Sequence, residues 1–201
     1  PRTAQLPAAG EFLTREFSTS VAAVGGPGGS DPLGSQVHSL VYVPRDAAAG
    51  RMRAPLVVCC HGLGESGLRV AGVGQRLAAA GAVAVVPSFR GGGAPTAGST
   101  TAMSVLTEIA DLEAVLDAAR AWPFVDVGRT ALFGRSQGGL VAALAAVGRP
   151  AQLSALVLWS PALRLPAAMR SLFGPGSAVP RALTPRLPGR AAPPGRRALR
   201  S

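Results

Sequence analysis

The chain has 201 residues, of which 48% are hydrophobic and 4% aromatic, enough for one domain with a core of Ala, Val and Leu. Its formal net charge of +10 is uneven, because residues 1–126 contain nine Arg and ten acidic residues whereas residues 127–201 contain eleven Arg and no acidic residue. No apolar run reaches the ~18 residues of a membrane-spanning helix, and residues 1–20 lack the order of a secretory signal, so we expect a cytoplasmic protein without membrane contact.

The cysteines and the positive charge predict no function of their own. Cys59 and Cys60 are adjacent in an apolar run, so we expect them on opposite faces of a strand as small buried side chains. Neither has a partner at ligand spacing, and we therefore expect no metal and no cofactor. The basic residues are all Arg and are not interleaved with aromatic residues, so we expect no specific nucleic-acid partner. The sequence gives no indication of the oligomeric state.

Residues 11–161 alternate strand-like and helical segments, which predicts an α/β fold with a mostly parallel sheet. In the first half of the chain, strands are predicted over 12–21, 37–43, 55–60 and 82–87, and a helix over 69–80. The segment 55–60 is continuously apolar, as expected of a central strand buried on both faces. The sequence GGPGG at 25–29 is predicted to be a loop, because no helix and no Gly-Lys-Ser/Thr follow it.

The second half of the alternating region continues the same pattern. A helix is predicted over 105–120, with Val105, Ile109, Leu112 and Leu116 on its apolar face. The charged residues of this helix are expected on its outward surface; they are Glu108, Asp111, Asp117 and Arg120. A short strand over 130–133, a helix over 140–147 and a buried strand over 153–159 follow.

The composition changes after Pro161. Residues 164–201 contain seven Pro and four Gly in 38 positions, together with eight Arg. The combined Pro and Gly content of this segment lies near the low-complexity range of about 25–30%. We therefore expect a partial α/β core over 1–163 and an Arg/Pro-rich tail over 164–201 that is disordered or translated out of frame.

The candidate site is the G-x-S-x-G sequence from Gly134 to Gly138, with Ser136 at its centre. A short strand precedes it and a helix follows, so the serine is expected on a sharp strand-to-helix turn that needs small flanking residues. This context favours a nucleophilic Ser136. The alternative is a serine in an ordinary glycine-rich turn.

Acyl transfer places negative charge on the carbonyl oxygen, which backbone N–H groups can stabilise. One donor is expected from the residue after the nucleophile, Gln137, and another from the loop after the third strand, where His61, Gly62 and Leu63 lie. The Leu63 N–H is the predicted second donor. His61 is interpreted as a residue that shapes the loop rather than as the catalytic base.

Four blocks, in order, resemble the α/β-hydrolases of the serine esterase and serine aminopeptidase-like group, and most closely the bacterial cinnamoyl (feruloyl) esterases. They are HGLGESG at 61–67, MSVLTEIADLEAVLDAAR at 103–120, LFGRSQGGL at 132–140 and LVLWSPA at 156–162. The resemblance implies an α/β-hydrolase fold with Ser136 as nucleophile and with Leu63 and Gln137 as oxyanion donors. It also implies that the loop over 90–93 shapes the substrate pocket.

The resemblance also implies a histidine base and a carboxylate later in the chain than the serine. The sequence has no His after His61 and no acidic residue after Asp126, so it holds neither group in that order. His38 precedes the nucleophile and is expected at a sheet edge, away from the base position. We therefore expect a chain truncated after about the sixth strand and nearly inactive by itself.

Three functions remain open at this point. The first is a serine hydrolase that cleaves carboxylic esters, and the second is a peptidase that uses the same site on a small peptide substrate. The third is a non-catalytic remnant that binds a small ligand in the same cleft. The acyl and alcohol groups of an ester substrate are not predicted.

Overall fold

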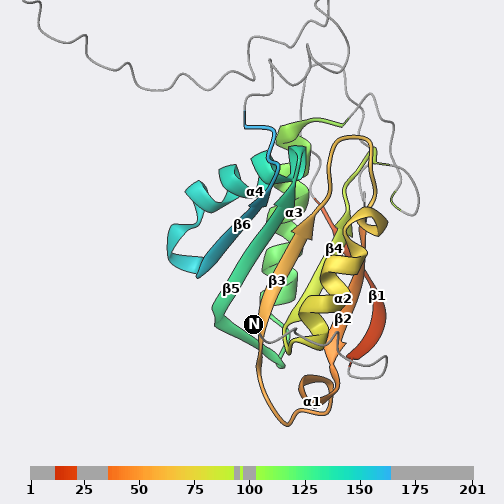
Figure 1. The fold of residues 1–201 in the computed structure, drawn as a ribbon, viewed down its shortest axis with the longest axis vertical. Coiled ribbons are helices and arrows are strands. Elements are labelled where there is room, and N and C mark those ends of the chain that lie inside the picture. Colours follow the sequence, from red (N-terminus) through yellow and green to blue (C-terminus); the bar gives the residue numbers. More distant parts are fainter. Residues whose placement is uncertain (1–11, 22–35, 93–95, 97–102, 164–201) are drawn as a thin grey trace, which may run out of the picture. The chain divides into compact units, whose positions relative to one another are not determined.

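The computed structural model describes residues 12–21, 36–92, 96 and 103–163, which form a six-stranded sheet with helices on both faces (Figure 1). The strands are β1 (Phe12–Ser20), β2 (Gln36–Pro44), β3 (Ala54–Cys60), β4 (Val83–Ser88), β5 (Val125–Arg135) and β6 (Ala155–Trp159). The helices are α1 (Arg45–Ala48), α2 (Ala71–Ala79), α3 (Val105–Arg120) and α4 (Gln137–Gly148), with 3-10 turns η1 (Gly67–Arg69) and η3 (Pro150–Gln152). None of these helices is long and apolar enough to cross a membrane.

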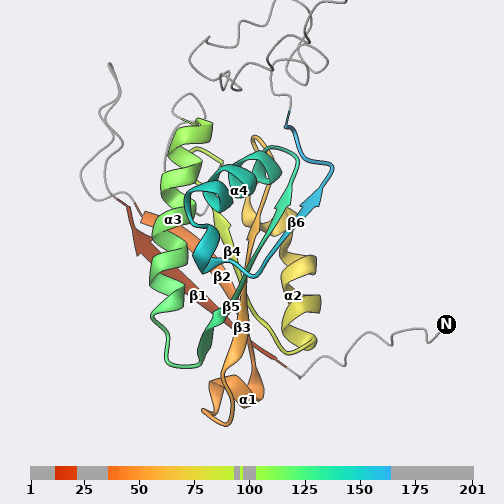
Figure 2. The same ribbon diagram turned by 90° about the vertical axis from the view of Figure 1, so that its left-hand side faces the viewer.

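The strand order is β1-β2-β4-β3-β5-β6. β1 pairs with β2 and β2 with β4 in antiparallel fashion, whereas the pairs from β4 to β6 are parallel. Figure 2 shows α2 on one face of the sheet and α3 and α4 on the other. This confirms the predicted fold class. Because the parallel strands end at one edge of the sheet, the loops that follow β3, β4 and β5 meet there.

The centre of the sheet is buried on both faces, as the apolar run at 55–60 predicts. Leu56, Val58, Cys59 and Cys60 of β3 are fully buried. Cys59 packs in a cluster with Tyr42 on the α2 face. Burial raises the pKa of the Cys59 thiol to about 12 and that of Cys60 well above its usual range, so both are neutral, unreactive core side chains.

Two expectations about the surface of the fold are wrong. Glu108 and Asp111 of α3 are fully buried rather than outward-facing, because three- and four-residue spacings place them in line with Val105 and Leu112. The strand β6 is exposed rather than buried, because it stands at the end of the described sheet and pairs only with β5. Three of its residues show this, with exposed fractions of 39% for Leu156, 54% for Val157 and 54% for Trp159.

Some boundaries also differ from the expectation. β5 begins at Val125, five residues before the predicted strand, and α4 begins at Gln137 rather than at Leu140. The early start of α4 places two glycines in its first turn, where the helix packs closely on the sheet. The predictions for GGPGG at 25–29 and for the tail at 164–201 lie outside the described residues.

Candidate active site

Ser136 lies at the sharp turn between β5 and α4, and residues 134–139 are called the Ser136 turn below. Its backbone has φ 53° and ψ −121°, a conformation that costs a non-glycine residue about 1–3 kcal/mol. Three backbone hydrogen bonds hold it. The Ser136 N–H donates to the Trp159 carbonyl (3.1 Å), and the Ser136 carbonyl accepts from Gly139 (3.0 Å) and from Ala162 (2.8 Å).

The glycines of the Ser136 turn are required by close contacts. A Cβ at Gly134 would overlap the Gly138 carbonyl oxygen, and a Cβ at Gly138 would overlap the His61 carbonyl oxygen. A Cβ at Gly139 would lie 2.7 Å from the Pro161 Cβ. The turn therefore packs against both the end of β3 and the segment that follows β6.

The loop after β3 (residues 61–67, the β3 loop) passes directly beside Ser136. A Cβ at Gly62 would lie only 3.2 Å from the Ser136 Cβ. The next residue in this loop is Leu63, and the residue after Ser136 is Gln137, the first residue of α4. The structure thus brings the segments of both predicted oxyanion donors together. In the described part of the chain, neither the Leu63 nor the Gln137 N–H donates to another backbone group outside the regular elements.

Glu65 is a site residue that the sequence analysis did not single out. Its Oε2 accepts the Gly62 N–H (2.9 Å), and both carboxylate oxygens accept from Arg135 Nη1 (2.5 and 2.6 Å). Burial alone would raise the pKa of this carboxyl, but the hydrogen bonds from Arg135 and Gly62 outweigh it and lower the pKa. A charged Glu65 therefore joins the β3 loop to the Ser136 turn. Its position inside the HGLGESG block was the available signal.

His61 is fully buried, and both of its ring nitrogens are engaged. Nδ1 lies 2.8 Å from the Gly62 carbonyl oxygen, to which it can only donate, and Nε2 accepts the Phe89 N–H at 3.0 Å. Burial lowers the pKa of the ring, against smaller opposing effects of the Gly62 carbonyl and the Glu65 charge. A neutral His61 that bridges the loops after β3 and β4 supports the interpretation that it shapes the β3 loop.

His38 does not lie at a sheet edge, which corrects the expectation for this residue. It is on β2, between β1 and β4, and its Nδ1 is 2.9 Å from the Ser18 Oγ. β4 and β3 separate β2 from β5, so three strand spacings of ~4.8 Å place His38 about 14 Å across the sheet from the Ser136 turn. Neither histidine of the chain is therefore placed to take a proton from Ser136.

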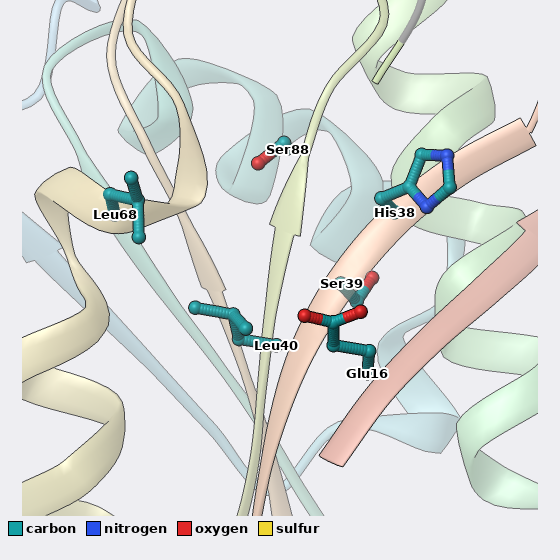
Figure 3. A pocket seen from close by; sticks show the side chains of 6 residues that line it. All are labelled: Glu16, His38, Ser39, Leu40, Leu68 and Ser88. Carbon is teal, nitrogen blue, oxygen red and sulfur yellow. The ribbon is translucent and has the colours of Figure 1, made fainter. Parts of the chain in front are cut away.

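A cavity of about 190 Å³ opens beside His38 (Figure 3). Its lining comes from β1, β2, β4 and η1, and consists of Glu16, His38, Ser39, Leu40, Leu68 and Ser88. None of these residues belongs to the Ser136 turn or to the loop segment at 61–63. The cavity is therefore not part of the candidate site as the described residues define it.

A buried carboxyl group lies behind the Ser136 turn. The Glu108 Oε2 accepts a hydrogen bond from the Gln137 Nε2 at 2.9 Å, and the Glu108 side chain is fully buried. Burial, reinforced by the nearby Asp111 charge, raises the pKa of Glu108 to about 8, although the Gln137 hydrogen bond opposes this shift. The sequence pattern did not indicate Glu108, because the charged residues of this helix were expected on its surface.

The loop after β4 is tied to α3. The Arg90 N–H donates to the Asp111 Oδ2 (2.8 Å), and the Arg90 Nε donates to the Asp111 Oδ1 (2.6 Å). Arg90 is only 6% exposed, so it holds the loop in place from within. The last residue of the predicted pocket loop, Gly93, lies outside the described residues.

No three His, Cys, Asp or Glu side chains of the described ranges gather as metal ligands would.

The sheet order, the flanking helices and the strand-to-helix turn define an α/β-hydrolase. A family model described as serine aminopeptidase, S33, matches residues 52–196. The chain belongs to this family. A search of the curated proteins finds no match.

Solved structures with the same fold include several hydrolases. Est1E from Butyrivibrio proteoclasticus, solved with ferulic acid bound, is 24% identical with a TM-score of 0.60, over 68% of this chain and 53% of that one. EstE1, a carboxylesterase from a metagenomic library, is 26% identical with a TM-score of 0.56, over 74% and 47%. Dienelactone hydrolase from Anabaena variabilis is 20% identical with a TM-score of 0.59, over 80% and 69%. The chain spans about half the length of Est1E and of EstE1.

Proposed function

We propose that the chain carries the nucleophile half of a serine hydrolase that cleaves carboxylic esters through an acyl-enzyme on Ser136. The observation that carries this proposal is the backbone of Ser136, φ 53° and ψ −121°, between β5 and α4. A nucleophile elbow has such a strained strand-to-helix turn, because it exposes the serine hydroxyl above the sheet. Membership of the S33 family and similarity to esterase structures support the proposal.

The Leu63 and Gln137 N–H groups are proposed to bind the oxyanion. Each comes from a segment that packs against Ser136, and each is free of partners in the loop and cap contacts of the described backbone. One such donor contributes about 3–4 kcal/mol to the transition state. The ion pair of Glu65 with Arg135 is proposed to keep the two segments in register.

No described residue is placed as the base of the proposed site. A serine hydroxyl is a poor nucleophile without one, and sites without the base retain only about 10³–10⁴-fold acceleration over water. Turnover by these 201 residues alone is therefore proposed to be slow. For the residues given, the lack of a base favours the third candidate, a non-catalytic hydrolase remnant that binds a small ligand.

Esters are proposed over amides for the chemistry that these residues can support. An amide releases an amine that must be protonated as it leaves, and no described residue is placed to supply that proton. A phenolate leaving group needs no such proton. The family description keeps the peptidase as the runner-up.

The test uses a fluorophosphonate probe on the full chain, with the adduct located by peptide mass spectrometry. We expect slow labelling at Ser136 and none in Ser136→Ala. Ser160, which also has a positive φ (45°), provides the matched control Ser160→Ala, which should label like the wild type. No adduct on Ser136 in the wild type would reject the proposal and leave the ligand-binding remnant.

The substrate class is tested with matched p-nitrophenyl acetate and acetyl p-nitroanilide. We expect slow Ser136-dependent release of nitrophenol from the ester and no release of nitroaniline from the amide. Faster cleavage of the amide than of the ester would favour the hypothesis that the protein is a peptidase.

A further inference from the structure

Glu108 is an unusual residue for the interior of a helix-covered sheet. Its side chain is fully buried, and its Oε1 has no hydrogen-bond partner among the described residues. Among the described residues, the hydrogen bond to its carboxyl comes from Gln137, the residue after Ser136. An ionised carboxylate left in this state would be very costly, whereas a neutral acid tolerates the same site much better.

Resting on the proposed function, we propose that Glu108, as a neutral carboxylic acid, is a positioning residue for acyl transfer at Ser136. Its Oε2 holds the Gln137 side chain and thereby orients the first turn of α4. That turn begins with the Gln137 N–H, the proposed oxyanion donor. Glu108 acts through Gln137 and is not itself a catalytic residue.

The neutral form matters because of the charge that develops next to it. Acyl transfer creates an oxyanion at the start of α4, and a carboxylate buried behind that turn would oppose it. Proton loss from Glu108 should therefore lower the reactivity of Ser136. Burial and the Asp111 charge raise the pKa of Glu108 to about 8, so this loss falls in a range that can be measured.

The ionisable groups near Glu108 come from α3, from β3 and from the loop after β4. Asp111 lies one turn further along α3, and its carboxylate is paired with Arg90 from the loop after β4. From β3, Cys60 interacts electrostatically with Glu108 and is itself held neutral by burial. The α4 side supplies the uncharged amide of Gln137. Of these groups, Glu108 is the one that both contacts the Ser136 turn and has a carboxylate oxygen without a hydrogen-bond partner among the described residues.

The test measures fluorophosphonate labelling of Ser136 in the full chain from about pH 6 to about pH 10, with each variant normalised to its own rate at the lowest pH. Comparing each normalised rate with that of wild type at the same pH removes the effect of rising hydroxide concentration, which all the proteins share. We expect the normalised rate of Glu108→Gln to exceed that of wild type by roughly tenfold above about pH 9. Glu113→Gln, an outward residue of the same helix, should follow wild type.

A second variant tests positioning apart from charge. Glu108→Leu leaves the Gln137 Nε2 without an acceptor, and we expect roughly tenfold slower labelling at low pH. Combining it with Gln137→Leu removes the unpaired donor and should restore part of the rate. If Glu108→Leu does not fold, the pH profile of Glu108→Gln decides whether the proposal for Glu108 stands.

The outcomes separate the two proposals. Labelling of Ser136 with the same pH profile in wild type and in Glu108→Gln would overturn this inference and leave the proposed function standing. Absence of labelling in wild type at every pH would overturn the proposed function and this inference with it.

Discussion

Arg135 donates to both carboxylate oxygens of Glu65, at 2.5 and 2.6 Å, and so joins the Ser136 turn to the β3 loop across 70 positions of sequence. Each side chain is 26% exposed. The same carboxylate accepts the N–H of Gly62, whose neighbour Leu63 is a proposed oxyanion donor. The pair therefore holds together the two segments that carry the proposed oxyanion donors.

The first prediction concerns this pair. Glu65→Ala should lower the free energy of unfolding by about 1–3 kcal/mol, because it leaves the Gly62 N–H and the Arg135 guanidinium without their acceptor. Arg135→Met should cost less, because the Gly62 hydrogen bond to Glu65 remains. Urea unfolding of both variants and of the double variant measures the coupling. Strictly additive effects would show that the pair does not join the two segments.

The second prediction concerns the packing of the Ser136 turn. Gly138→Ala should prevent folding or shift the turn, because its Cβ would overlap the His61 carbonyl oxygen. Gly72→Ala in α2 is the matched control, since nothing lies within 4 Å of its Cβ position. It should stabilise the protein by up to about 1 kcal/mol, the helix preference of Ala over Gly. Thermal unfolding followed by circular dichroism measures both, and equal effects would contradict the packing argument.

The third prediction concerns the pH dependence of stability. The pKa of Glu108 is raised from 4.5 to about 8 in the fold, mainly by burial. Between these values the folded state keeps a proton that the unfolded state has lost, so stability should fall as pH rises from about 4.5 to about 8. Glu108→Gln should remove this decline relative to wild type, whereas Glu113→Gln should keep it. Denaturant unfolding at a series of pH values measures it, and parallel curves for wild type and Glu108→Gln would contradict the assigned shift.

The fourth prediction compares two leucines on strands. Leu56 of β3 is fully buried, and Leu156 of β6 is 39% exposed. Leu56→Ala should cost about 2–5 kcal/mol, as for other buried leucines. Leu156→Ala should cost clearly less than Leu56→Ala, because 39% of Leu156 stays exposed to water in the fold. Comparable losses in urea unfolding would mean that β6 is covered in solution.

The sequence alone predicted the strands, the main helices and the place of Ser136. These features depend on local patterns: the apolar run at 55–60, the helical spacing over 105–120 and the small residues around the serine. Local patterns also gave the correct opposite faces of Cys59 and Cys60. The alternation of strands and helices was sufficient for the α/β class, because parallel strands need helical crossovers.

Only the tertiary structure decided which charged residues are buried and which apolar strand is exposed. Glu108 and Asp111 are inside because partners from α4 and the loop after β4 reach them, and those contacts span more than twenty positions of sequence. The apolar strand β6 is exposed because it stands at the end of the described sheet, and burial depends on neighbours that a strand's own residues do not specify. The joining of Glu65 to Arg135 beside Ser136 likewise appears only once β3 and β5 lie side by side.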